Sequence, residues 1–336
     1  MLETKTVVAG GVTCLGEALV LISQAERHLA GAEANVAAGL MAWGVPAAFA
    51  GRLGDDDLGA VVRKELDAHG VDTTALQLDA SRPTGSYSKV TDIDDMGEPR
   101  TSSSYRRAGS AASAMTTAFL DDPDVASVLG RASVVHCSGI TAALSESCQA
   151  LMRRLLTERP GIPGLVSFDV NWREQLWPGG DPAVVVDLAD KADLVLVGAD
   201  EARRVMGTDD PVALRRILPH PATIVVKDGA VRAVAIDPDG ETISVPALRV
   251  EVVEPVGAGD AFAAGYLSGV VSGDDVVTCL RRGHVGAAAT LTVPRDSAPP
   301  PPADLLRHLL TCSATEWAAT TATAAGFSIP DVGEHA

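Results

Sequence analysis

The sequence predicts an α/β fold in which helices cover both faces of a mainly parallel sheet. Two observations favour this fold. Short runs rich in Val and other apolar residues recur between residues 7 and 229, and longer segments of helical composition lie between them. Such alternation is typical of strand–helix–strand units, whose strands lie parallel. Ligands of these sheets bind where the strands end and the next turns begin.

The expected elements follow in chain order. The strands are the runs VVAGGVTCLG, PAAFAG, SVVHCSG, GLVSFDV, DLVLVG and TIVVKDG. Helices are expected at residues 32–43, 56–69, 145–158, 200–206 and 211–218.

Residues 83–107 interrupt this pattern. Two runs rich in Tyr, Ser and Thr, TGSYSKV and RTSSSYRR, flank the polar turn DIDDMGEP. This arrangement predicts a hairpin outside the main sheet. The hairpin either covers a binding site or only decorates the body, and the segment alone leaves both readings open.

Four successive prolines, residues 299–302, precede a last short helix. The segment 311–336 that follows is rich in Ala and Thr and weakly patterned, so its order stays open.

Composition excludes several classes of function. The formal net charge is −17 and aromatic residues make up 4%, so neither phosphate neutralisation nor base stacking favours a nucleic-acid partner. No apolar run is long enough to span a membrane. The five cysteines are odd in number and form no CxxC pair, and the first residues lack a signal-peptide pattern. We therefore expect a cytoplasmic protein with free thiols.

The segment EPVGAGDAFAAGYLSGV, residues 254–270, is a candidate site. If a buried helix begins near Gly257, the amides of Gly257, Ala258 and Gly259 lie at its positive end, where a phosphate could approach closely. Asp260 would then accept a proton from an attacking hydroxyl. The alternative is that Asp260 only caps a tight turn. The spacing alone does not choose between them.

Other polar residues lie near expected strand ends. The chain has no GxxxxGK[ST] loop, so phosphate charge must be met by backbone dipoles, Mg²⁺ and other side chains, for which Lys227 is a candidate unless it is a solvated lysine. Arg107 and Arg173 come from separate segments, and an arginine fork suits a carboxylate. Either arginine could instead be a surface residue. Together they make an anionic substrate worth testing.

At this point the motifs resemble a known family. GAEANVAAGLMAWG, GRLGDDDLG, TGSYS, RRAGSAAS, FDVNWREQLW, VVKDGA and PVGAGDAFAAGYLSG are similar to those of the ribokinase-like (PfkB) sugar kinases, and the match runs through most of residues 8–296. RAGSA together with DVNWR most resembles the 2-keto-3-deoxygluconate kinases.

The resemblance implies a role for each site residue. Asp260 would be the catalytic base and the amides of Gly257, Ala258 and Gly259 the anion hole, and Glu201 would organise a metal through water. Lys227 and Gly229 would bind the nucleotide. The substrate would contact Gly31, Asn35, Tyr87, Tyr105, Arg107, Arg173 and Asp296.

The resemblance also implies a ribokinase-like domain over residues 1–310, with a small β-sheet lid from about 17–31 and 83–110 and an appendage at 311–336. ATP and Mg²⁺ are the expected cofactors, with a monovalent cation as a further candidate, and a homo-oligomer would form through the lid. The predicted function is phosphorylation of the terminal hydroxyl of 2-keto-3-deoxygluconate. The alternatives are a kinase for a neutral sugar of the fructokinase or ribokinase type and a non-catalytic sugar-binding sensor.

Overall fold

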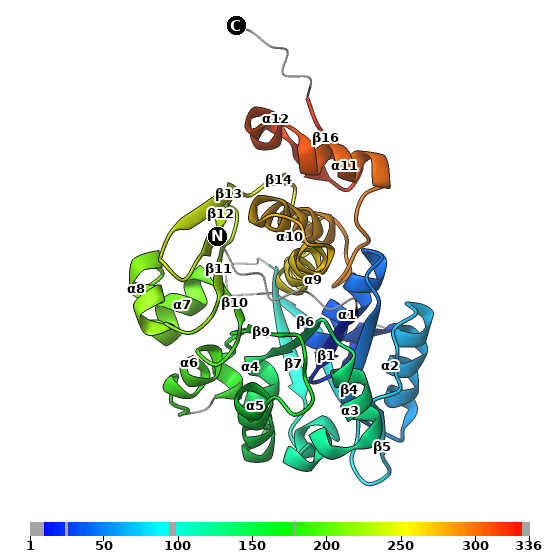
Figure 1. The fold of residues 1–336 in the computed structure, drawn as a ribbon. Helices are drawn as coiled ribbons and strands as arrows, with labels where there is room; N and C mark the ends of the chain where they lie inside the picture. The colour runs from blue at the N-terminus through cyan, green and yellow to red at the C-terminus, as the bar shows by residue number, and fades with distance from the viewer. Residues whose placement is uncertain (1–9, 24–25, 94–98, 178, 331–336) are drawn as a thin grey trace, which may run out of the picture.

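A computed structural model describes residues 10–23, 26–93, 99–177 and 179–330 of the chain. Its body contains a nine-stranded sheet (Figure 1). The strand order is β13 (Thr242–Pro246), β12 (Arg232–Ile236), β11 (Thr223–Asp228), β10 (Leu194–Gly198), β9 (Leu165–Asp169), β8 (Val134–Ser138), β1 (Val12–Leu15), β4 (Ala47–Gly54) and β5 (Leu76–Asp79). The strands from β11 to β5 are parallel, and β12 and β13 are antiparallel. The predicted α/β fold is confirmed.

Alternating side chains of the central strands enter two separate cores. Leu194 and Leu196 of β10 belong to one apolar cluster and Val195 and Val197 to the other. This is the period of two that a strand imposes, and it explains why a strand covered on both faces is apolar throughout.

Helices cover both faces of the sheet. The first core is formed with α1 (Ala32–Ala42), α2 (Asp57–Ala68), α9 (Ala258–Ser272) and α10 (Val276–Leu291). The second is formed with α3 (Pro123–Gly130), α4 (Gly139–Ala143), α5 (Glu146–Glu158), α6 (Ala183–Ala189), α7 (Ala199–Met206) and α8 (Pro211–Ile217). Short 3₁₀ turns occupy Ala112–Ala114, Thr117–Asp121 and Glu174–Leu176.

All six expected strands and all five expected helices are present, and all but the first strand end within about three residues of the prediction. The first strand, predicted from residue 7, is β1 from Val12, and residues 7–9 of that prediction lie outside the described residues. The predicted ranges of α2 and α5 included the capping residues. Asp56 accepts a hydrogen bond from the amide of Gly59, and Ser145 from that of Cys148. These side chains satisfy helix amides that have no intrahelical partner.

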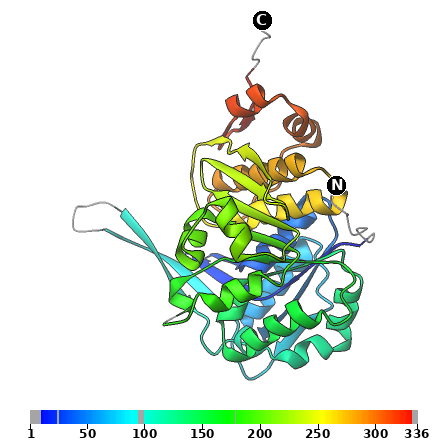
Figure 2. The same cartoon turned by 60° about the vertical axis from the view of Figure 1, so that its left-hand side comes forward.

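A smaller sheet lies outside the body, as the interruption at residues 83–107 predicted. Its order is β3 (Glu26–Ala30), β2 (Leu19–Ser23), β6 (Gly85–Ile93) and β7 (Pro99–Arg106). The antiparallel β6–β7 ribbon extends away from the body (Figure 2). Part of the predicted turn, residues 94–98, lies outside the described residues.

The chain ends on the side of the body near α10 (Figure 1). Here α11 (Ala303–Thr311) is followed by α12 (Ala314–Ala319), β15 (Thr321–Thr323) and β16 (Gly326–Ser328). The sequence left the order of residues 311–336 open. In the structure β15 and β16 form a three-stranded sheet with β14 (Arg249–Val250), and Trp317 of α12 is fully buried.

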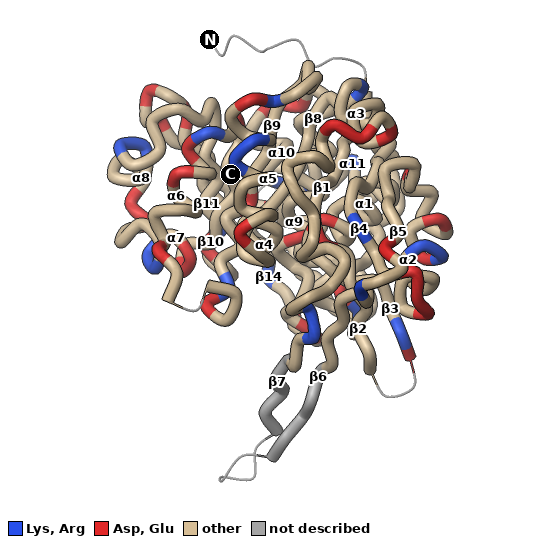
Figure 3. The backbone as a smooth tube through the Cα atoms, turned by 90° about the horizontal axis from the view of Figure 1, so that it is seen from below, with Lys and Arg blue, Asp and Glu red and all other residues tan. Residues whose placement is uncertain are grey.

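Among the described helices, none has the length and apolarity needed to cross a bilayer. Lys and Arg residues are dispersed among Asp and Glu along the described chain (Figure 3).

Candidate active site

The predicted site residues meet in one cavity of about 720 Å³. The cavity lies at the carboxyl ends of β9, β10 and β11, where Asp169, Gly198 and Lys227 contribute to its wall. This is the edge at which ligands of parallel sheets bind. The predicted residues lining it are Gly31, Asn35, Tyr87, Tyr105, Arg107, Arg173, Glu201, Lys227, Gly229, Gly257, Ala258, Gly259, Asp260 and Asp296.

The GAGD loop begins a helix that points into this cavity. Gly257 is the N-cap of α9 and has φ 86°, and a Cβ added there would lie 2.0 Å from the carbonyl oxygen of Asp296. A side chain at this position would therefore meet both backbone strain and a clash. The first amides of α9 have no carbonyl one turn earlier, and the dipole adds positive potential there. The loop is built to receive an anion.

The Asp260 carboxylate lies in the first turn of α9 and does not cap it, because no side chain caps this helix. It accepts a hydrogen bond of 2.8 Å from Nδ2 of Asn35 instead. Burial raises the pKa of Asp260 to about 7, while the Asn35 hydrogen bond lowers it and Asp169 raises it further. A carboxyl group with this pKa can take up a proton near neutral pH.

We expect kcat/KM to depend on pH through the hydrogen-bonded pair Asp260 and Asn35. A base must be deprotonated, so kcat/KM should rise as pH increases through about 7 and level off above it. Asn35 donates to the ionised carboxylate, so Asn35→Ala should move this midpoint upward by about 0.5–1 pH unit. The check is a pH profile of kcat/KM for both proteins, with thermal melts as a control for folding over the same range. A midpoint that stays or falls contradicts the assignment.

We expect Gly257→Ala to lower kcat about 100-fold, because the displaced loop amides would no longer be in place to stabilise negative charge in the transition state. Steady-state kinetics would measure it. Gly273→Ala is the matched control, since it adds the same methyl group at another positive-φ glycine, the C-cap of α9, where no atom of the described residues lies within 4 Å of the added Cβ, and it should change kcat little. Equal activity of the Gly257 variant would show that the loop geometry is not needed.

Lys227 lines the cavity and is mostly buried. Its Nζ is 2.7 Å from Oδ2 of Asp169, and 15% of its side chain is exposed. Burial disfavours the charged lysine, but Asp169, Glu201 and Asp260 together raise its pKa above the ordinary value. The lysine is therefore a fixed positive charge in the site and not the solvated residue of the alternative reading.

Polar groups from β6, from β7 and from the segment after α10 meet in the cavity. The Tyr87 hydroxyl donates to Oδ2 of Asp296 at 2.5 Å. Burial and the Asp296 carboxylate raise the pKa of Tyr87, so the phenol keeps its proton. The rings of Tyr87 and Tyr105 stack with centroids 5.1 Å apart, and the Arg107 guanidinium lies 4.3 Å from the Tyr105 centroid.

The two predicted carboxylate-binding arginines are both in the cavity, but each pairs with a carboxylate of the chain. Nη1 of Arg107 is 3.3 Å from Oε2 of Glu17, and Nη1 of Arg173 is 3.0 Å from Oε1 of Glu201. Among the described residues, no group forms a hydrogen bond with the buried Nε of Arg107. A substrate carboxylate would share Arg107 with Glu17 and Arg173 with Glu201.

Several polar residues of the cavity were not among the predicted site residues, including Glu17, Asp169 and Asn171. Glu17 is buried, and burial raises its pKa to about 7, against the lowering effect of Arg107. Asp169 holds Lys227, and Asn171 has φ 39°, an uncommon conformation for a residue other than glycine. The signal that could have found them is their position, since each polar side chain follows an apolar run directly at a strand end.

The residues at this site fit Mg²⁺. Oδ1 of Asp169 is buried with no hydrogen-bond partner, and the Glu201 carboxylate lines the same cavity. In the described part of the chain, no cluster of three His, Cys, Asp or Glu side chains could hold a metal. One or two carboxylates plus phosphate oxygens and water form the usual shell of Mg²⁺, which dehydrates reluctantly.

Part of the cavity wall is aliphatic. This aliphatic wall is formed by Ala247, Leu248, Val250 and Val252 on and beside β14 (Arg249–Val250) and by Ala287, Ala288 and Leu291 of α10. Small aliphatic side chains suit a flat ring system. Asp228 and Arg232 line the same cavity, and Arg232 pairs with Pro246 next to this wall.

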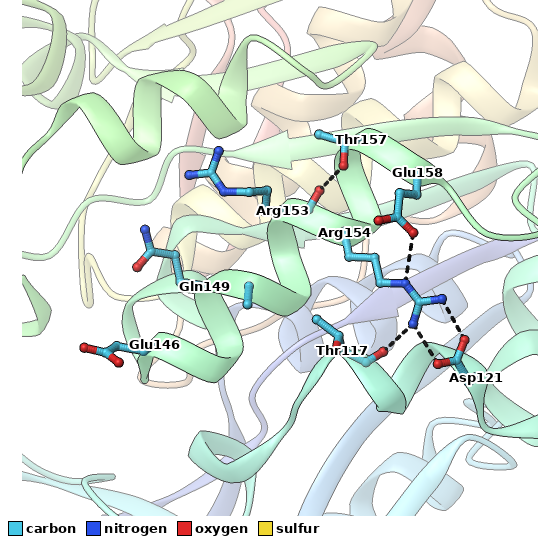
Figure 4. Close-up of a pocket in the computed structure, with 9 residues that line it drawn as sticks. Thr117, Asp121, Glu146, Gln149, Arg153, Arg154, Thr157 and Glu158 are labelled. Atoms are coloured by element: carbon cyan, nitrogen blue, oxygen red, sulfur yellow. Dashed lines mark hydrogen bonds and ion pairs between the residues drawn. The ribbon is translucent and has the colours of Figure 1, made fainter.

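A second hollow, of about 590 Å³, lies on the outer face of α5 (Figure 4). Its Arg154 is held by both carboxylate oxygens of Asp121 at 2.7 Å, and Arg153 pairs with Asp187 at 2.5 Å. The arginines are already neutralised at an exposed surface, so we assign no ligand to this hollow.

A cavity with an acid at a helix N-terminus and a buried lysine is compatible with phosphoryl transfer, which relies on positioning and on positive charge near the phosphates. The pfkB family carbohydrate kinase model matches residues 11–303. The chain therefore belongs to the pfkB family of carbohydrate kinases.

Known relatives extend this match. The chain is 32% identical to a 2-dehydro-3-deoxygalactonokinase of Haloferax volcanii over 300 residues, covering 88% of this chain and 91% of the relative. It is 31% identical to a 2-dehydro-3-deoxygluconokinase of Bacillus subtilis, with 88% and 90% covered. It is also 31% identical to a fructokinase of Klebsiella pneumoniae, with 78% and 85% covered.

Solved structures agree on the fold. A PfkB protein from Polaromonas sp. JS666 superposes with a TM-score of 0.72 at 31% identity, covering 85% of this chain and 98% of that one. A Vibrio cholerae fructokinase variant in its fructose-, ADP- and potassium-bound form superposes with a TM-score of 0.75 at 24% identity, covering 90% and 99%.

Proposed function

We propose that this carbohydrate kinase transfers the γ-phosphoryl group of ATP to the terminal hydroxyl of 2-keto-3-deoxygluconate (also named 2-dehydro-3-deoxygluconate) or a close sugar acid. The observation that carries the proposal is that Arg107 and Arg173 line the cavity into which Asp260 and the start of α9 point. The guanidinium groups of Arg107 and Arg173 would bind the carboxylate of a sugar acid, and Asp260 beside the anion hole would activate its hydroxyl.

In the proposed reaction Asp260 removes the proton of the sugar hydroxyl, and the amides of Gly257, Ala258 and Gly259 receive charge on the phosphoryl oxygens. Lys227 supplies a fixed positive charge, and Gly229 lies beside it on the nucleotide side. Mg²⁺, oriented by Glu201 through water, would supply further positive charge to the phosphates. Tyr87, Tyr105, Asp296, Asn35 and Gly31 position the sugar.

A kinase for a neutral sugar is the second candidate, and the similarity to the Klebsiella fructokinase favours it. A neutral sugar would leave Arg107 and Arg173 without a role beyond their pairs with Glu17 and Glu201. A sensor without catalysis would not need a carboxyl group at Asp260, so we place it last.

The surroundings of the reaction are part of the proposal. The β6–β7 ribbon extends from the body (Figure 2) and would form a dimer through the lid. All five cysteines are buried free thiols, which supports a cytoplasmic location. Potassium in the Vibrio cholerae relative supports testing a monovalent cation as activator.

The test is a coupled ATP-turnover assay over 2-keto-3-deoxygluconate, 2-keto-3-deoxygalactonate, fructose and ribose, with and without Mg²⁺ and K⁺. The proposal expects the highest kcat/KM with a sugar acid. A higher value with a neutral sugar would select the second candidate, and no turnover with any of them would support the sensor.

A further inference from the structure

The C-terminal segment 312–330 lies beyond the matched family region, which ends at residue 303, yet it is anchored in the body. Trp317 is fully buried, and its Nε1 donates to the carbonyl oxygen of Pro246 at 2.8 Å. The Arg281 guanidinium of α10 lies 4.9 Å from the Trp317 ring and donates to the carbonyl oxygens of Leu310 and Cys312. One arginine thus holds both the end of α11 and the tryptophan.

The same segment supports a wall of the cavity through its backbone. β15 is the strand that pairs with β14 among the described strands. The amide of Glu251 donates to the carbonyl oxygen of Ala322 at 2.9 Å. Val250 of β14 and Val252 just after it both belong to the aliphatic wall of the cavity. The position of this wall therefore depends on the C-terminal strand.

A row of rings makes a second connection. Trp317 packs against His284 with centroids 6.3 Å apart, and His284 meets the edge of Phe262 at 5.5 Å. His284 and Phe262 both line the cavity, and Phe262 lies two residues after Asp260 on α9. His284 is also held by the carbonyl oxygen of Val245, 3.0 Å from its Nε2. Movement of Trp317 would reach the cavity through these rings.

We infer that segment 312–330 is a positioning element for the nucleotide, which holds the part of the aliphatic wall formed by β14 and the side chains after it against the base of ATP. The inference rests on the proposed function only in taking ATP as the ligand of this wall. The proposed sugar-binding residues Tyr87 and Tyr105 belong to β6 and β7, whereas β14 pairs with β15 in a different sheet, so loosening the C-terminal segment should weaken nucleotide binding more than sugar binding.

The test uses the full chain with two variants outside the cavity, Arg281→Met and Trp317→Phe. The first removes the anchor of the segment, and the second keeps an aromatic ring but removes the hydrogen bond to Pro246. Arg307→Met on α11 is the matched control, because the Arg307 side chain is exposed and pairs with Asp304 of the same helix. ADP binding is measured by calorimetry, and KM for 2-keto-3-deoxygluconate in the coupled assay.

We expect Arg281→Met to weaken ADP binding about tenfold and Trp317→Phe somewhat less, with the sugar KM changed less than about twofold and Arg307→Met like wild type. Unchanged ADP affinity in both variants overturns the inference. So does an equal loss for ADP and sugar, which would indicate general destabilisation. Failure of the wild type to bind ADP would overturn the kinase assignment itself, whereas failure of the sugar acid as substrate leaves the ADP result interpretable.

Discussion

Replacing Asp260 with asparagine is expected to lower kcat by about three to four orders of magnitude. The amide retains the size of the carboxyl group but cannot accept the hydroxyl proton at neutral pH. Because the amides of the loop and the cavity walls remain, affinity for ADP and for 2-keto-3-deoxygluconate should change only modestly. Steady-state and single-turnover assays would measure the rate, and calorimetry the binding.

Asp296→Asn is the matched control for this experiment. Asp296 lines the same cavity and accepts a hydrogen bond from Tyr87 at 2.5 Å, but it lies on the sugar side and not in the first turn of α9. Its replacement should raise KM for the sugar more than it lowers kcat. Near-normal turnover by the Asp260 variant would refute the general-base assignment, and equal losses of kcat in both variants would leave the base unassigned between the two.

The fold could be predicted because its signal is local. A strand covered on both faces is mostly apolar, and β10 is therefore visible as a continuous apolar run. In β8 and β9 the run is interrupted by the buried pair His136 and Ser167, which hydrogen-bond to each other. The loop at Gly257 is also readable, since small residues before an acid are needed where a backbone approaches an anion. The structure adds a reason for Gly257 in particular, the carbonyl oxygen of Asp296 that occupies the space of a Cβ.

What the sequence left open depends on contacts between distant segments. Glu17 is one acid at the end of one strand, and only its pairing with Arg107 from the lid places it in the site. Lys227 could have been a solvated residue until Asp169 was placed 2.7 Å away. Trp317 lies in a weakly patterned segment, and its burial depends on Pro246 and Arg281, which no local pattern connects to it.

The second large effect concerns the substrate. Replacing both Arg107 and Arg173 with methionine should raise KM for 2-keto-3-deoxygluconate by about two to four orders of magnitude, because each of the two charge-assisted hydrogen bonds lost costs about 1.5–3 kcal/mol. Turnover of fructose, where the wild type shows any, should change little. The measurement is kcat/KM for both sugars in each protein.

The expected selectivity follows from the contacts of the two arginines. Arg107 pairs with Glu17 and Arg173 pairs with Glu201, and a substrate carboxylate would add a second partner to each arginine, which a neutral sugar would not. Arg107→Lys keeps the charge beside Glu17 but loses the planar fork, so it should recover only part of the affinity. If the double variant loses fructose and sugar acid equally, the arginines hold the site together and do not select its substrate. A loss confined to the acid would assign the carboxylate to the two arginines and leave the phosphoryl chemistry at Asp260 unchanged.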